Sequence, residues 1–208
     1  MEDDKQPVLD WSTPPPGAVE TSLWPCLHDA ELVCLTSDRL KRTARLEFSI
    51  PYLIRFHRLP DNLHFVLVLS SVTSARVIQS FPWPGDFAVP QGASYEEQEK
   101  LIADYWSKWR EESISWSEFE SKFSTDPWTA EVSNADYLIG EDGKFALRLQ
   151  LMVDGNTYCE LTLRAETVQV ERSDGEPFSL TRLIHLGESY WEAFAAKRKV
   201  PHGDGTEQ

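Results

Sequence analysis

The sequence contains little of what most catalytic and cofactor-binding motifs require. Its 208 residues include only ten glycines and three cysteines. Glycine-rich phosphate loops, the dinucleotide-binding fingerprint and the serine-hydrolase motif are all missing. Nucleotide-binding, dinucleotide-binding and serine-hydrolase functions therefore lose their main sequence support. The cysteines, Cys26, Cys34 and Cys159, are too few and too scattered for a disulfide framework or a paired CxxC metal site. We expect free thiols in a reducing compartment.

Long hydrophobic runs and an excess of basic charge are also missing. The apolar stretches are short and flanked by charge, well below the ~20 residues that span a bilayer. The start, MEDDKQPVLDW, lacks the basic and then apolar order of a secretory signal. The formal net charge is −14, whereas nucleic acids and anionic membranes are bound through basic patches. We therefore expect a soluble cytoplasmic protein that binds neither nucleic acid nor membrane.

The chain is predicted to form one α+β domain. With 41% hydrophobic residues it can bury a sizeable core. We predict antiparallel β-meanders packed against an inserted helical pair and a C-terminal helix. The expected segments are an extended arm at 1–23, the domain at 24–200 and a disordered tail at 201–208. Within the domain we expect a first β block at 24–80, a helical insert at 94–124, a second β block at 128–172 and a closing helix at 178–198.

Alternating apolar residues predict the strands of both blocks. In the first block these are 30–36 and 43–50 as a hairpin, FVLVL at 65–69 as a central strand covered on both faces, and 72–78. The second block carries three Asp-Gly pairs, which are typical of hairpin turns, at 142–143, 154–155 and 174–175. Between them, apolar residues at 147–153, 159–163 and 168–170 predict a three-stranded meander.

The two β blocks are similar in sequence. TARLEFSI (43–50) parallels ALRLQLMV (146–153), and LVLSSVTSARV (67–77) parallels LTLRAETVQV (161–170). Alternation alone produces such matches, so they indicate either an internal duplication or two independent meanders. A duplication predicts two related β-meanders side by side.

The insert is predicted to contain two amphipathic helices. Ser94 with Glu97, and Ser115 with Glu118, form capping boxes ahead of aromatic-rich apolar stripes. These aromatics either form a platform for a sugar or base or pack against the sheet, and we expect packing. The candidate binding residues here are Trp106, Trp109 and Trp116.

Charge is unevenly distributed along the chain. Residues 38–58 contain six basic and two acidic residues, whereas residues 95–131 contain ten acids against four bases. Such asymmetry indicates either a partner surface or solvated helix faces.

The stretch WPCLHDAELVCL at 24–35 holds a possible reactive pair, His28 and Asp29. Cys26 and His28 could act as nucleophile and base, but same-face side chains two residues apart on a strand lie about 7 Å from each other. The five histidines show no metal-ligand spacing, and we expect no metal or cofactor. We predict a positional role at the start of a strand, in which Asp29 accepts backbone N–H groups in an Asx turn and His28 bonds a carbonyl across the loop.

HDAELVCLTSDRLKRTARLEF resembles the opening of several families of small bacterial α+β proteins of unknown function. These families include some immunity proteins of polymorphic toxin systems. The resemblance covers about 25 residues, is echoed more weakly in AETVQVERSDGEPFSLTRL, and excludes the aromatic insert. It implies no catalytic residues.

Two functions are consistent with these patterns. The first is a non-catalytic binding or immunity-type protein that presents its acidic insert to a basic protein partner. The alternative is a small-ligand protein or metal-dependent enzyme with a site at His28 and Asp29, joined in space by His57 or His64.

Overall fold

The computed structural model describes residues 19–80, 90–107, 111–125, 130–140, 143–153 and 157–198. They form an α+β fold built on one antiparallel sheet, as the sequence predicts. The strands are β1 (Val19–Ser22), β2 (Glu31–Asp38), β3 (Thr43–Ser49), β4 (His64–Ser70), β5 (Ser74–Ser80), β6 (Glu111–Ile114), β7 (Ala130–Ile139), β8 (Phe145–Val153), β9 (Thr157–Ala165), β10 (Thr167–Arg172) and β11 (Pro177–Phe178). The helices are α1 (Trp24–Leu27), α2 (Pro51–His57), α3 (Tyr95–Ser107), α4 (Trp116–Thr125) and α5 (Leu180–Arg198). No helix in the described ranges is long and apolar enough to cross a membrane.

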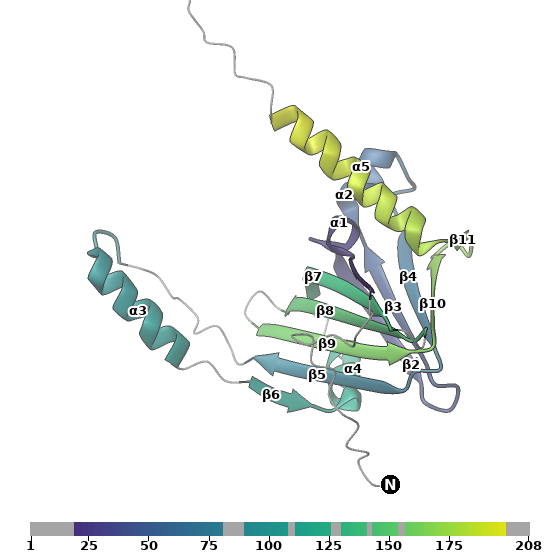
Figure 1. Ribbon diagram of the computed structural model, residues 1–208, viewed down its shortest axis with the longest axis horizontal. Helices are drawn as coiled ribbons and strands as arrows, with labels where there is room; N and C mark the ends of the chain where they lie inside the picture. The colour runs from purple at the N-terminus through teal and green to yellow at the C-terminus, as the bar shows by residue number, and fades with distance from the viewer. Residues whose placement is uncertain are drawn as a thin grey trace, which may run out of the picture.

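The sheet is folded into two halves that face each other across the core. One half has the strand order β11-β10-β4-β3-β2 and the other has the order β7-β8-β9-β5-β6. In Figure 1 the strands of the two halves run in clearly different directions. Sheets packed at a steep angle are joined at corners by strands that pass from one sheet to the other.

Two such strands turn the corner here. β4 continues into β5 through Ser71, whose φ is 55°, and β9 continues into β10 through Glu166. β4 pairs with β10, and β5 pairs with β9. The predicted three-stranded meander is therefore wrong in its third strand, because residues 168–170 pair with β4 instead of β9. Alternation along β10 says which residues face the core, but it does not say which strand lies alongside.

The segments that match between the two blocks occupy equivalent places in the sheet. β3 corresponds to β8, and the bent pair β4–β5 corresponds to β9–β10. Each half of the chain runs through five strands into a helix, β2 to β6 and then α4, and β7 to β11 and then α5. In the first half α2 is inserted between β3 and β4, and α3 between β5 and β6. This equivalence is what a duplication predicts, although the halves exchange strands at the corner and do not form separate meanders.

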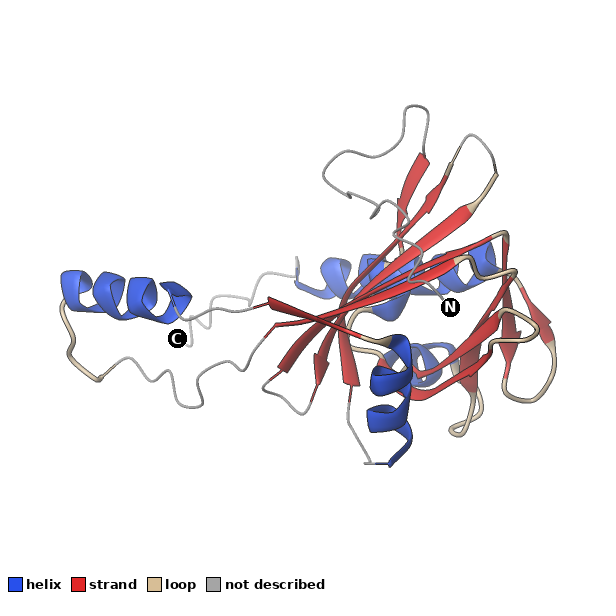
Figure 2. Ribbon diagram, turned by 90° about the horizontal axis from the view of Figure 1, so that it is seen from below, coloured by secondary structure: helices blue, strands red, loops and turns tan. Residues whose placement is uncertain are grey.

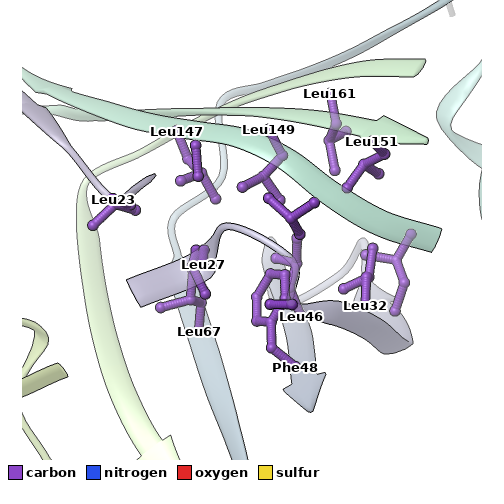
Figure 3. Close-up of a cluster of buried hydrophobic side chains, with 14 of the residues drawn as sticks. Leu23, Leu27, Leu32, Leu46, Phe48, Leu67, Leu147, Leu149, Leu151 and Leu161 are labelled. Atoms are coloured by element: carbon purple, nitrogen blue, oxygen red, sulfur yellow. The ribbon is translucent and has the colours of Figure 1, made fainter. Parts of the chain in front are cut away.

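The core lies between the two half-sheets. Inward side chains of β8 and β9, such as Leu149 and Leu161, face those of β3 and β4, such as Leu46 and Leu67 (Figure 3). All four are fully buried. Burying apolar surface contributes about 25 cal/mol per Å², so this shared core ties both halves together.

The N-terminal boundary differs from the prediction. Residues 19–22, expected in the arm, form β1 and pair with β7, and Leu23 is fully buried. The rest of the expected arm and the tail at 201–208 lie outside the described residues, as does the Asp-Gly pair at 154–155.

The helices are distributed unequally around the sheet. α1, α2 and α5 gather at one end, α4 lies beside β2 and β5, and α3 projects away from the sheet (Figures 1 and 2). The prediction that the insert packs on the sheet is therefore confirmed for α4, which buries Phe119 and Phe123, and wrong for α3. Both predicted capping serines cap their helices, with Ser94 and Ser115 accepting the amides of Glu97 and Glu118.

Candidate functional site

The predicted reactive pair lies in the turn between α1 and β2. α1 is a single helical turn, and Asp29 adopts a φ of 58° before β2 begins at Glu31. The backbone of this turn is attached to β7, since Asp29 N–H donates to Val132 O (3.0 Å) and Val132 N–H donates to Ala30 O (2.8 Å). The residues therefore stand at the start of a strand, as predicted.

Both ring nitrogens of His28 face oxygen atoms. Nδ1 lies 3.2 Å from the carbonyl oxygen of Ser133 on β7, and Nε2 lies 3.3 Å from Oδ1 of Asp29. The predicted bond from His28 to a carbonyl across the loop is present. No hydrogen bond among the described residues corresponds to the predicted Asx turn. The Asp29 carboxylate instead faces Nε2 of His28. The His28 ring is thus held between β7 and the Asp29 carboxylate.

The thiol of the neighbouring Cys26 is not activated as a nucleophile. Cys26 is fully buried and its Sγ donates to the carbonyl oxygen of Leu23 (3.2 Å). Burial raises the pKa of the Cys26 thiol to about 12. Because the thiolate is the nucleophilic form, this geometry opposes a nucleophile and base formed by Cys26 and His28.

An aromatic cluster joins α1, α2 and α5 around His28. The His28 ring stacks on Trp24 at 4.6 Å, and Trp24 contacts Trp191 at 4.8 Å. Tyr52 and Trp191 both donate to the carbonyl oxygen of Pro25, at 3.2 and 3.0 Å. Burial raises the pKa of the Tyr52 phenol far above its usual range, so the phenol remains a neutral donor. The cluster fastens the three helices to one another.

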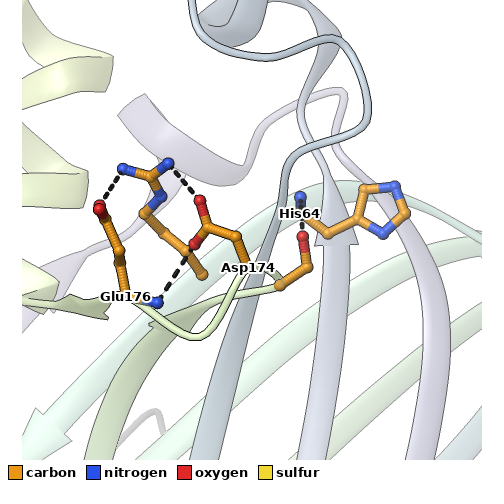
Figure 4. A network of polar contacts seen from close by, with 5 residues as sticks. His64, Asp174 and Glu176 are labelled. Carbon is orange, nitrogen blue, oxygen red and sulfur yellow. Dashed lines mark hydrogen bonds and ion pairs between the residues drawn. The ribbon is translucent and has the colours of Figure 1, made fainter.

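The other histidines proposed for an enzymatic site have partners of their own. His57 Nε2 lies 2.9 Å from Leu186 O on α5, and His64 Nδ1 lies 2.6 Å from Glu47 Oε1 on β3. In Figure 4 the His64 ring points away from the carboxylates of Asp174 and Glu176. Within the described ranges, no group of three or more His, Cys, Asp or Glu residues could hold a metal ion.

Trp116 of the insert does not join His28. Trp116 Nε1 donates to Ser37 Oγ (3.1 Å) near the far end of β2. Six residues separate Ser37 from Glu31 along that strand, which corresponds to roughly 20 Å. Trp109 and the side chain of Trp106 lie outside the described residues. The five candidate binding residues therefore do not form one site.

Sequence reasoning missed a hollow beside Trp116. It is lined by Arg39 and Arg42 from the β2–β3 turn and by residues of the bend between β4 and β5. The basic excess at 38–58 was a signal for it, but only the fold brings that turn next to the bend and α4. Comparison with family models, curated proteins and solved structures finds no match for this chain.

Proposed function

We propose that this is a non-catalytic binding protein that docks a basic protein partner through the acidic insert helix, α3. The observation that carries the proposal is the position of α3, which projects from the body while α4 of the same insert packs on the sheet (Figure 2). A helix that contributes little to the core is available to contribute to an interface.

The described surface of α3 combines apolar anchors with acidic charge. Tyr95 is 74% exposed and Leu101 36% exposed. Glu96 and Glu99 are exposed beside them. Apolar anchors within a charged rim are typical of energetically important interface patches. The chain's net charge of −14 adds long-range attraction for a basic partner and speeds docking.

The candidate reactive residues support a binding function over catalysis. His28, His57 and Cys26 each bond a backbone carbonyl, and Cys26 is held as a neutral thiol. Groups engaged in this way fix the scaffold. The enzymatic alternative would require such groups to converge on an open cleft.

The resemblance of residues 28–48 to immunity-type proteins suggests the class of partner, a toxin domain with a basic surface. Co-expression with the product of the neighbouring gene tests this. We expect formation of a complex and protection from toxicity, with affinity falling as salt rises.

Variants of α3 test the docking surface. We expect Tyr95→Ala with Leu101→Ala to weaken binding at least tenfold, and Glu96→Gln with Glu99→Gln to slow association and reduce its salt dependence. Glu166→Gln with Glu192→Gln, two exposed acids elsewhere, is the matched control. Equal effects of the two acid pairs, or no effect of the apolar pair, would contradict docking through α3.

A further inference from the structure

The hollow beside Trp116 lies where three parts of the fold meet. The β2–β3 turn, the bend between β4 and β5, and the first residue of α4 enclose a volume of about 250 Å³. It lies at the end of β2 opposite to His28, and α3 does not line it. Any ligand bound there would be independent of the proposed docking helix.

Much of the lining of the hollow is apolar. The apolar part is contributed by Ala44, Val72, Ala75, Leu163 and the Trp116 indole. The indole is fixed in place, because its N–H donates to Ser37 Oγ and that hydroxyl in turn donates to Glu120 (2.9 Å). A rigid aromatic wall of this kind favours a flat apolar ligand.

The rim of the hollow is basic. Asp38 also lines it, but Lys41 Nζ lies 3.3 Å from Asp38 Oδ2, and the amides of Leu40 and Lys41 donate to Asp38 Oδ1. The charge of this carboxylate is therefore compensated within the turn. Among the described residues, Arg39 and Arg42 have no carboxylate partner. The two arginines therefore bring two positive charges to the lining of one hollow.

The backbone holds one of these arginines in a costly conformation. Arg42 has a φ of 53°, in the left-handed region that glycine or asparagine occupies with less strain. Its Nε donates to Val72 O (3.0 Å) across the bend, which directs the side chain toward the hollow and leaves its terminal nitrogens available. Strained residues of this kind often occur at ligand sites.

We propose that this hollow binds a small organic anion with a one- or two-ring apolar body. The body lies against Trp116 and Leu163, and its carboxylate or sulfonate group meets Arg39 and Arg42. Guanidinium groups bind such anions through charge-assisted, bidentate hydrogen bonds. The volume lies just below the usual range of about 300 to 1,000 Å³ for small-molecule sites, which limits the ligand to this size.

Two fluorescent probes that share one ring system test the proposal. 5-Dimethylaminonaphthalene-1-sulfonate carries the negative charge, and 1-dimethylaminonaphthalene is its neutral analogue. Titration of the full chain should show saturable sulfonate binding. Arg39→Gln and Arg42→Gln should each weaken it about tenfold, as expected for a lost charge-assisted bond, and leave the affinity for the neutral probe unchanged.

Two further variants complete the experiment. Arg58→Gln is the matched control, since Arg58 is exposed, shares the φ of 53° and lies away from the hollow at the end of α2. Ala75→Leu fills the hollow and should reduce binding of both probes, with circular dichroism confirming the fold. Sulfonate binding that is absent, that persists in Ala75→Leu, or that weakens equally in Arg58→Gln and Arg39→Gln would overturn the proposal.

Discussion

At the scale of single residues, the polar groups near the α1–β2 turn fix neighbouring elements in place. The carbonyl oxygen of Pro25 accepts hydrogen bonds from Tyr52 on α2 and Trp191 on α5. It also approaches Gly187, where an added Cβ would collide with Pro25 O. One backbone carbonyl thus connects three helices, and His28 extends these contacts to β7.

The position of His28 predicts a structural cost for its removal. His28→Ala should lower the free energy of unfolding by about 1 to 2 kcal/mol, because it removes the bond to Ser133 O and the stacking on Trp24. Chemical denaturation measures the change. His185→Ala is the control, since His185 is exposed and bonds only Glu188 three residues away, and it should have little effect. Intact stability together with lost function in His28→Ala would instead favour a catalytic role.

Gly187 should not tolerate a side chain. Replacing a glycine in a helix interior with alanine usually stabilises the protein by about 1 kcal/mol. Here the added methyl group would collide with the α1 backbone, so Gly187→Ala should lower stability by about 1 to 3 kcal/mol, the usual cost of overpacking. The close approach of α1 explains why a glycine stands at this position. A raised melting temperature would contradict this contact.

At the scale of elements, the two helices of the insert pack differently despite similar sequence patterns. Both begin at a serine cap and carry an apolar stripe. α4 buries Phe119 completely, and its Glu120 accepts hydrogen bonds from the backbone and side chain of Ser37. α3 leaves Tyr95 and Leu101 exposed. Periodicity identifies an apolar face, but it does not say whether the partner of that face belongs to the same chain.

This difference predicts unequal energetic effects. Replacing residues 90–107 with a Gly/Ser linker should change the free energy of unfolding by less than about 0.5 kcal/mol, as for other surface changes. Phe119→Ala should cost about 3 to 5 kcal/mol, because it leaves a cavity in the core. Thermal denaturation of both variants measures these changes in stability. A large loss in the linker variant would show that α3 packs on the body.

At the scale of the whole molecule, the corner strands interlock the two halves of the chain. β4 from the first half pairs with β10 from the second, and β9 from the second pairs with β5 from the first. The buried leucines of both half-sheets form one continuous cluster. Neither half retains its full sheet or its full core without the other.

We therefore expect cooperative unfolding in a single transition. Leu46→Ala on β3 and Leu149→Ala on β8 should each lower the free energy of unfolding by about 2 to 5 kcal/mol. Both substitutions should shift the midpoint of the same transition. Tryptophan fluorescence and circular dichroism should give coincident curves for each variant. Two separate transitions, with each substitution moving only one of them, would indicate that the halves fold independently.

The sequence by itself determined the local features of this protein. Capping boxes and alternation depend on neighbouring residues, so they predicted α4 and the β2–β3 hairpin. The expected closing helix is present as α5, and the position of His28 at the start of a strand predicted its bond to a carbonyl. Only the tertiary structure decided which strands pair across the corner, that α3 projects from the sheet, and that Arg39, Arg42 and Trp116 line one hollow. Those outcomes depend on contacts between residues far apart in the chain. Hydrophobic periodicity and motif spacing do not say which distant segment packs against a given face.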